Sequence, residues 1–322
     1  MSRVVVIGGS GHIGSYLIPA LVDQGNEVIS ISRGVSERYH GLQSTWDRVT
    51  HLSIDRVAEE KSGTFGKRVA DLNPDIVVDL ISFDLPSTQG LVEALRGKVE
   101  HFLHCSSVWV HGHLECVPAK ETAVMNPYGE YGVNKAAIET WLLQDARRNG
   151  FPATIFRPGH IVGPGWLPIS PYGNFDAQVF TLMAAGKEIT LPNFGLETLH
   201  HVHAADVVQF ILLAIANRAS AVGESFNVVS EQALTLRGYA EAIFRWFGHE
   251  PQLALLPFDE WKKKQSASQA HHAWEHISRS HSFSIEKAQQ RVGYRPRYSS
   301  LEAIKESVIA AITAGDIQAT VV

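Results

Sequence analysis

The chain has 322 residues, of which 45% are hydrophobic and 19% are charged, so it can bury a large core as one large domain or two coupled ones. Its formal net charge is −5 and its one basic block is Lys262–Lys264, which argues against nucleic-acid and membrane-surface binding and favours small-molecule partners. The only cysteines are Cys105 and Cys116, which are too few for a disulfide framework. No apolar run reaches the length of a membrane span, and the apolar start at Val4–Ile7 is shorter than a signal-peptide core. We therefore expect a soluble protein in a reducing cytoplasm.

Short apolar, β-branched runs alternate with segments of helical spacing along the first part of the chain. The runs predict buried strands; these are Arg3–Ile7, Glu27–Ile31, Val49–Ile54, Asp75–Leu80, Glu100–Cys105 and Ala153–Arg157. Helical spacing lies between several of them, as at Ile13, Leu17 and Leu21. The alternation predicts an α/β fold with a doubly wound parallel sheet. Pro19 lies inside the first helical segment, so we expect a kink there or a shorter helix.

The composition changes after Arg157, where prolines and glycines crowd into residues 158–173. Such a stretch holds little regular structure, so we expect the chain to cross there into another layer. A helical segment at Asp206–Ala216 and a strand at Glu224–Val229 then resume the first pattern. The sequence therefore predicts a first domain of residues 1–165 and 204–232 and a smaller, discontinuous lobe of residues 166–203 and 233–322.

The first predicted strand runs into a glycine-rich loop and then into a helix. Gly8 suits a tight turn, Gly11 a close approach to a pyrophosphate, and Gly14 close packing of the helix on the strand. The helix N-terminus offers unpaired N–H groups and the positive end of its dipole to phosphates. We therefore expect a dinucleotide to bind here, the alternative being a merely structural turn. The expected contacts are Gly8, Ser10, Gly11, His12, Ile13 and Gly14.

The residues after the second strand indicate which dinucleotide fits. A carboxylate there bonds the adenosine ribose of NAD and repels a 2′-phosphate, but this chain has Ser32 and Arg33. Arg33 can pair with a phosphate, so NADP(H) is favoured, with NAD possible; the alternative is an ordinary solvated arginine. Asp55, after the third strand, is placed to bond the adenine amino group, although a helix N-cap would look identical.

Tyr131 and Lys135 stand four residues apart at the start of a helical segment, which places both side chains on one face. They follow the fifth strand, whose carboxyl end carries Ser106 and Ser107, and ligands of parallel sheets bind at the carboxyl ends of strands. The alternative for Tyr131 is an aromatic residue packed on the sheet. We expect further cofactor contacts after the fourth and sixth strands; these are Leu80, Ile81, Ser82, Pro158 and Gly159, with Ser106 after the fifth.

Together these motifs resemble the extended short-chain dehydrogenase/reductase family, of the NAD-dependent epimerase/dehydratase type. Other segments extend the resemblance over nearly the whole chain; they are Val110-His111-Gly112, Arg157-Pro158-Gly159, Gly163-Pro164, His203 with Asp206, and Gly293-Tyr294-Arg295-Pro296. The resemblance implies a Rossmann-type sheet that binds the dinucleotide and a smaller lobe that binds substrate. It also implies a homodimer, formed through a four-helix contact that includes the Tyr131 helix.

The resemblance further implies the catalytic roles. Tyr131 would exchange a proton with a substrate hydroxyl or carbonyl while hydride moves to or from the nicotinamide. Lys135 would hold the nicotinamide ribose and lower the pKa of the tyrosine, and Ser107 would hydrogen-bond the reacting oxygen. A nearby ammonium favours the tyrosine anion and moves its pKa from near 10 toward the operating pH, which agrees with these roles.

This sequence departs from the family pattern at several positions. Sugar dehydratases of the family carry an Asp-Glu pair where this chain has Val108 and Trp109, which argues against dehydration. Epimerases of the family grip a nucleotide diphosphate with an asparagine and an arginine, where this chain has His160 and Leu199. A further family arginine falls near Trp274, with Arg279 as a substitute. The diphosphate grip looks incomplete, which weakens the case for a UDP-sugar substrate.

Sixteen histidines invite a metal hypothesis, but no acidic or cysteine ligands join them at the usual spacings, so we expect no functional metal. His111, His113 and His160 are expected near the pocket mouth, where they either bond substrate hydroxyls or lie in loops. Trp109 is expected to form an apolar wall of the substrate site. The sequence thus predicts an NADP(H)-preferring oxidoreductase or epimerase for a secondary alcohol/ketone of a sugar-like substrate. The rival interpretation is a dinucleotide-sensing regulatory or RNA-associated binding protein on the same fold.

Overall fold

The computed structural model describes residues 1–34 and 41–320. Its main element is a parallel seven-stranded sheet of order β11-β6-β5-β4-β1-β2-β3. The strands are β1 (Arg3–Ile7), β2 (Glu27–Ser32), β3 (Thr50–Ser53), β4 (Ile76–Asp79), β5 (His101–Cys105), β6 (Ala153–Pro158) and β11 (Ser225–Val228). The predicted doubly wound sheet is confirmed, with each strand end within one residue of the expected position. The strand order reverses between β1 and β4, and ligands of such sheets bind at this point.

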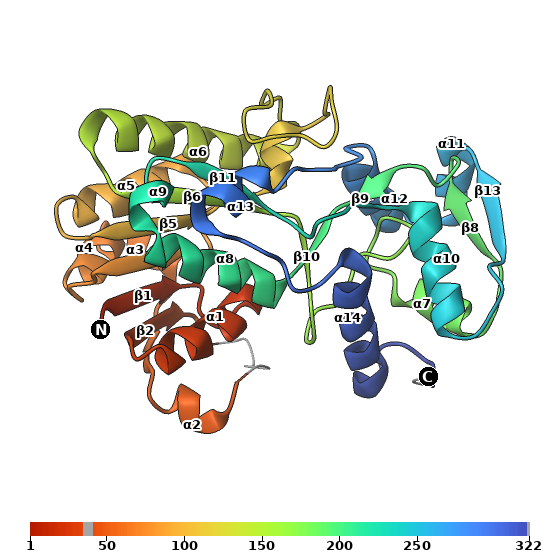
Figure 1. Cartoon of the computed structure of the whole chain (residues 1–322), viewed down its shortest axis with the longest axis horizontal. Coiled ribbons are helices and arrows are strands. Elements are labelled where there is room, and N and C mark those ends of the chain that lie inside the picture. Colours follow the sequence, from red (N-terminus) through yellow and green to blue (C-terminus); the bar gives the residue numbers. More distant parts are fainter. Residues whose placement is uncertain (35–40, 321–322) are drawn as a thin grey trace.

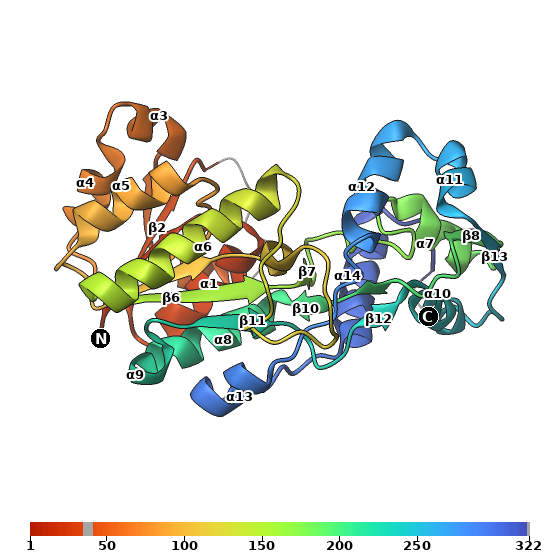
Figure 2. The same cartoon turned by 90° about the horizontal axis from the view of Figure 1, so that it is seen from above.

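Helices cover both faces of the sheet (Figure 2). One face carries α1 (His12–Asp23), α2 (Gln43–Trp46), α8 (Ala204–Ala216), α9 (Arg218–Ala221) and α13 (Glu286–Val292). The other carries α3 (Arg56–Lys61), α4 (Phe65–Ala70), α5 (Leu85–Leu95) and α6 (Glu130–Asn149). Each face of the sheet has its own hydrophobic core, because successive side chains of β1 point to opposite faces. Val4 and Val6 pack into the core on the α1 side, and Val5 and Ile7 pack into the core on the α5 side.

Helix α1 continues through Pro19 to Asp23, so the shorter helix allowed for by the sequence is wrong. Leu17, Leu21 and Val22 of this helix are buried in the core shared with α8. Burial of this apolar face stabilises the last turn even though proline lacks the N–H that would bond the preceding turn.

A smaller lobe lies beyond the sheet, at the right of Figure 1. Its helices are α7 (Ala177–Ala184), α10 (Leu236–Trp246), α11 (Phe258–Trp261), η2 (Lys262–Lys264), α12 (Ala267–Ile277) and α14 (Ser300–Ala314). Three strand pairs accompany them; they are β7 (His160–Val162) with β10 (His201–His203), β8 (Ile189–Pro192) with β13 (Leu253–Leu256), and β9 (Thr198–Leu199) with β12 (Leu234–Thr235). A separate core of residues between 162 and 317 holds the lobe together.

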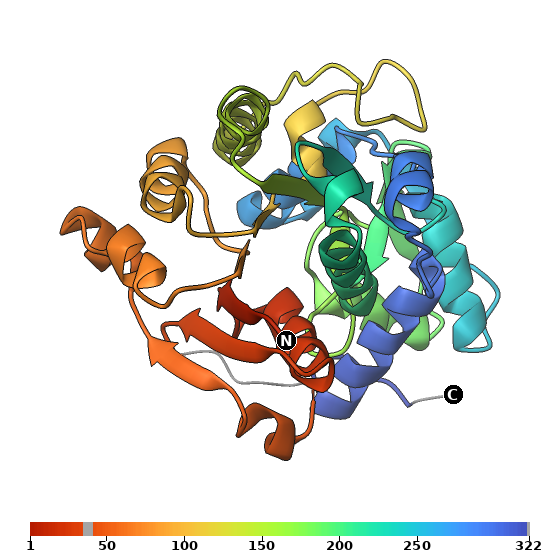
Figure 3. The same ribbon diagram turned by 60° about the vertical axis from the view of Figure 1, so that its left-hand side comes forward.

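The two parts of the molecule are tied by the chain beyond residue 282. Phe283, Ala288, Val292 and Tyr294 return to the core beside the sheet, although they lie within the range expected for the second lobe. In Figure 3 the orange and olive helices α3 to α6 lie on the opposite side of the sheet from the blue C-terminal helix α14. Among the described residues, none of the helices is both long and apolar enough to span a bilayer.

Candidate active site

The glycine loop joins β1 to α1 at the carboxyl edge of the sheet. Gly8 has a φ of +92°, a conformation that favours glycine, and its N–H donates to the carbonyl of Ile31 at 2.8 Å. A Cβ on Gly14 would lie 2.4 Å from the carbonyl oxygen of Gly9, so glycine lets α1 pack on this turn. No side chain of the described residues caps α1 at Gly11, which leaves N–H groups of its first turn available to a phosphate.

Two clefts open along this edge and share Gly8, Gly11 and Ile81. The first has a volume of about 350 Å³, and the predicted residues that line it are Gly8, Ser10, Gly11, Ser32, Arg33, Asp55 and Ile81. The second has a volume of about 320 Å³, and the predicted residues that line it are Gly8, Gly11, His12, Ile13, Gly14, Leu80, Ile81, Ser107, Trp109, Tyr131, Gly159 and His160. Because the clefts adjoin at the glycine loop, the residues fit an extended dinucleotide.

The first cleft lies at the ends of β2 and β3, where the sequence led us to expect the adenosine. Asp55 accepts a hydrogen bond from the N–H of Ala58 at 3.2 Å through Oδ1, so it is the N-cap of α3. Ser32 accepts from the N–H of Gly34 at 3.3 Å, and Arg33 is exposed at the cleft edge. The capping role that the sequence left open for Asp55 is therefore present, and the cation expected for a 2′-phosphate borders the cleft.

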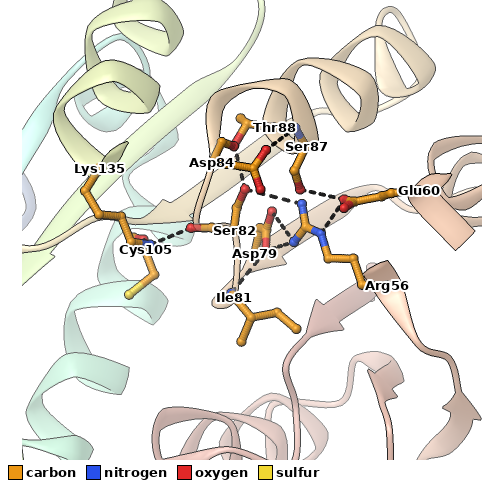
Figure 4. Close-up of polar contacts among 10 residues, drawn as sticks. All are labelled: Arg56, Glu60, Asp79, Ile81, Ser82, Asp84, Ser87, Thr88, Cys105 and Lys135. Carbon is orange, nitrogen blue, oxygen red and sulfur yellow. Dashed lines mark hydrogen bonds and ion pairs between the residues drawn. The ribbon is translucent and has the colours of Figure 1, made fainter. Parts of the chain in front are cut away.

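Ser107, Tyr131 and Lys135 come together between β5 and α6. Ser107 begins the 3₁₀ turn η1 (Val108–His111), where its Oγ accepts from the N–H of Trp109 at 3.2 Å. Lys135 is buried and its Nζ donates to the carbonyls of Ser82 and Cys105, at 2.7 Å each (Figure 4). The Lys135 Nζ also lies 5.8 Å from the ring centre of Tyr131. Ser107 and Tyr131 line the second cleft, and Lys135 lies behind it.

The pKa of Tyr131 differs from the sequence expectation. One face of this ring forms a wall of the open cleft, which leaves the residue 41% exposed. The surrounding protein nevertheless raises its pKa to about 12, against a smaller lowering by the Ser107 hydroxyl. Burial also lowers the pKa of Lys135. In the protein without cofactor the pKa of Tyr131 is therefore raised, where the sequence led us to expect a lowering beside Lys135, because desolvation is the largest effect on it.

A buried arginine network, absent from the sequence interpretation, supports the loop after β4 (Figure 4). Arg56 donates to both carboxylate oxygens of Asp79, at 2.8 and 3.1 Å, and to Glu60 at 2.7 Å. Its Nη2 also donates to the hydroxyl of Ser82 at 3.3 Å. The carbonyl of the same Ser82 accepts from Lys135, so the network fixes a hydrogen-bond partner of Lys135. An arginine directly after Asp55 was the available signal, but its buried partners lie 23 and 26 residues away.

A second buried ion pair binds the side chains of Ser106 and His111, which the sequence had placed at the cleft. Glu139 and Arg157 are fully enclosed and paired, and the Ser106 hydroxyl donates to Glu139 at 3.0 Å. If Ser106 contacts the cofactor, the contact is therefore made by its main-chain atoms and not by its hydroxyl. His111 does not line the cleft, because its ring is fully buried and bonded to Arg157 at 2.9 Å; the expected substrate contact is corrected accordingly. Pro158 and Ser82 also lie outside the set that lines either cleft.

Aromatic and imidazole rings form one side of the second cleft. Trp109 makes edge contacts with Tyr131 and His276, at centroid distances of 5.7 and 5.5 Å. His160 contacts His276 at 5.2 Å, and burial lowers its pKa well below the ordinary value. Trp109 and His160 therefore lie where the sequence placed them. His276 was missed as a cleft residue, because its helix is separated by more than a hundred residues from the glycine loop, Ser107 and Tyr131.

Arg279 does not replace the missing diphosphate-binding arginine. Its guanidinium lies between the rings of Trp109 and Tyr128, 3.8 and 3.9 Å from their centres. It donates to the carbonyl of Tyr128 at 2.9 Å and to Glu275, and it does not line the cleft. Across residues 1–34 and 41–320, no three histidine, cysteine or acidic side chains are grouped as metal ligands would be.

A parallel sheet with this strand order, a glycine loop at its edge and a Ser-Tyr-Lys set beside the adjoining cleft define an NAD(P)-dependent enzyme of the short-chain dehydrogenase/reductase type. Residues 4–228 match the family model described as the NAD dependent epimerase/dehydratase family. The chain belongs to that family, as the motifs predicted.

Similar proteins have diverse names. The chain is 27% identical over 318 residues to the "Chloroplast stem-loop binding protein of 41 kDa b, chloroplastic" of Arabidopsis thaliana, covering 95% of this chain and 78% of that protein. It is 25% identical to a dTDP-6-deoxy-L-talose 4-dehydrogenase (NAD(P)(+)) of Kitasatospora kifunensis, covering 97% and 96%. A UDP-glucose 4-epimerase structure from Thermotoga maritima superposes with a TM-score of 0.74 at 21% identity, covering 97% and 99%. This likeness shows the shared fold.

Proposed function

We propose that the protein is an NADP(H)-preferring oxidoreductase or epimerase that acts by hydride transfer on a secondary alcohol/ketone of a sugar-like substrate. The observation that carries this proposal is the cleft shared by Ser107, Tyr131 and the glycine loop, with Lys135 directly behind it. Relatives whose names specify sugar dehydrogenases and epimerases support the substrate class.

A bound nicotinamide supplies the hydride donor or acceptor. In the reducing direction the Tyr131 hydroxyl donates a proton to the carbonyl oxygen, and a pKa raised to about 12 keeps that proton in place near neutral pH. The Ser107 Oγ accepts from the N–H of Trp109, and its hydroxyl lies within hydrogen-bonding reach of Tyr131, so its O–H can turn to donate to the same substrate oxygen. Two of the three N–H groups of Lys135 bond main-chain carbonyls, which leaves one for a ribose hydroxyl of the cofactor.

Replacement of Tyr131 tests the catalytic part of the proposal. With NADPH and a panel of ketosugars, Tyr131→Phe should lower kcat by a factor of roughly 10²–10⁴ and leave NADPH affinity unchanged, because only the proton donor is lost. Tyr128→Phe is the matched control, since the Tyr128 hydroxyl bonds Ser278 at 2.6 Å outside the cleft. Full activity of Tyr131→Phe would refute the assignment.

The NADP preference rests on Arg33 at the cleft edge and on Ser32 in place of an acid. Arg33→Ala should weaken NADPH binding relative to NADH, because the 2′-phosphate loses its cation. Arg68→Ala, an exposed arginine on α4, is the control. Tighter binding of NADH than NADPH by the unaltered protein would contradict the preference.

Epimerisation and net redox use the same three residues and differ in whether the cofactor is regenerated in place. Purification with about one equivalent of dinucleotide retained would support an epimerase, whereas a freely exchanging dinucleotide would support net oxidation or reduction. The homodimer and the cytoplasmic location stay predictions.

A second candidate, an RNA-associated binding protein, is favoured by the name of the Arabidopsis relative. The surface charge of this chain opposes it. In the one basic block, Lys262 pairs with Asp259 and Lys263 with Glu260. A gel-shift titration with a stem-loop RNA tests this candidate, and binding that weakens steeply with salt would support it.

A further inference from the structure

We propose that the substrate is an uncharged cyclic polyol or its ketone, such as a free sugar or cyclitol, held between aromatic faces and imidazoles. The inference rests on the proposed function and narrows it, because it excludes the phosphate-linked sugars that several relatives are named for. It depends on the chemistry of the second cleft.

No lysine, arginine, aspartate or glutamate is among the described residues that line this cleft. A diphosphate in such a site would lose its hydration without gaining the charge-assisted bonds that proteins use to bind it. The N-terminus of α1 also lines this cleft, but the proposed function assigns it to the pyrophosphate of the dinucleotide. The N-terminus of α7 offers the substrate no substitute, since the carboxylate of Asp176 accepts from the N–H of Gln178 at 2.9 Å and caps α7 beside Phe175. A negative charge already occupies that end of the helix and repels anions.

The Arg279 guanidinium, which packs on the cleft residue Trp109, does not line the cleft. Arg279 is enclosed between the rings of Trp109 and Tyr128, and its Nη groups donate to Tyr128 and Glu275, whereas its buried Nε has no hydrogen-bond partner among the described residues. Releasing it would break both ring contacts and uncover the back of the cleft wall. The substrate therefore meets the indole of Trp109 and not the positive charge behind it.

His276 offers an acceptor to a hydroxyl group. Its Nδ1 lies 2.8 Å from the carbonyl of Gly173 and 2.7 Å from that of His272. Carbonyls only accept, so Nδ1 carries the hydrogen and Nε2 keeps a lone pair. Burial lowers the pKa of His276 to about 4, so the ring stays neutral near pH 7. His160, 5.2 Å away, adds a second imidazole.

Two aromatic side chains remain uncovered at the cleft mouth. Trp166 is 49% exposed and Phe175 is 46% exposed, and both line the cleft with Trp109. Flat apolar surfaces of this kind pack well against the C–H faces of a sugar or cyclitol ring. The cleft has a volume of about 320 Å³, which is of the size that small-molecule sites have.

Titrations of the NADPH-bound protein test the inference, with tryptophan fluorescence and saturation-transfer NMR as readouts. The anionic probes are UDP and UDP-glucose; the neutral probes are glucose, galactose, mannose, myo-inositol and scyllo-inosose. We expect no binding of either anionic probe at millimolar concentration and saturable binding of at least one neutral probe. Trp166→Ala should weaken that binding about tenfold or more, because a stacking face is lost.

Trp274→Ala is the matched control, because Trp274 is also 49% exposed but packs on Phe258, 5.4 Å away, outside the cleft. Micromolar binding of UDP would overturn the inference, and so would the failure of every neutral probe while NADPH remains bound. Failure to bind NADPH, read separately from nicotinamide fluorescence, would instead overturn the proposed function.

Discussion

Acidification should destabilise this protein strongly, because many of its histidines are buried without charge. His201 is fully buried, and neither of its ring nitrogens has a hydrogen-bond partner among the described residues. Burial lowers the pKa of His201 to about 3, and it lowers the pKa of His281 to about 3 as well. Protons therefore bind the unfolded chain first, so the stabilisation is complete above about pH 6.5 and is lost as the pH falls toward these lowered values.

The size of the effect follows from the pKa difference. At about pH 5 the unfolded-state pKa of 6.5 lies about 1.5 units higher, so each such histidine costs about 2 kcal/mol relative to neutral pH. Two of them remove about 4 kcal/mol, a large part of an ordinary unfolding free energy. Lowered pKa values at His104, His160 and His200 add to the loss.

Urea unfolding at about pH 7.5 and about pH 5 measures this loss. His201→Phe should lose about 2 kcal/mol less than the unaltered protein between the two values, because one buried proton acceptor is gone. Each protein is compared with itself at the two pH values, so any change in unfolding free energy that the substitution causes at both values cancels. His271→Phe, at an exposed position on α12, is the control. An equal loss in the His201→Phe and unaltered proteins would refute the reasoning.

Three further predictions concern the elements around the cleft. Arg157→Leu should lower the unfolding free energy by about 3–5 kcal/mol, because Glu139 is left buried and unpaired, and the added Glu139→Leu change should recover part of this in urea unfolding. Gly14→Ala should weaken NADPH binding and lower thermal stability, because its Cβ would lie 2.4 Å from the carbonyl oxygen of Gly9. Gly90→Ala is the control and should preserve both properties, because nothing lies within 4 Å of a Cβ there. Arg56→Met should raise the Kd for NADPH in fluorescence titrations by loosening the loop that contacts both clefts, and an unchanged Kd would count against that role.

Strand positions could be predicted from the sequence because each central strand is buried on both faces. A continuous apolar run such as Val4–Ile7 is then a strong signal by itself. The glycine loop was predictable for a related reason, since turn, strand and helix are neighbours in the chain. The two-residue strand β12 gave no such signal, because it pairs with β9 across a long separation.

Side-chain environments were less predictable than positions. His111 and His160 each lie between a glycine and an apolar residue in the sequence, yet His111 bonds a buried ion pair and His160 lines the cleft. The roles of Arg56 and His276 depend on partners far along the chain, which spacing alone does not reveal. The raised pKa of Tyr131 was not predicted either, because it comes mainly from desolvation, which residue spacing does not reveal.

Titration of purified protein with NADPH and NADH, followed by nicotinamide fluorescence, tests the central claim most directly. The cleft geometry predicts saturable binding at one site per chain, tighter for NADPH, and weakened by Gly14→Ala. Failure of both dinucleotides to bind the unaltered protein would contradict the assignment of this site to a nicotinamide cofactor.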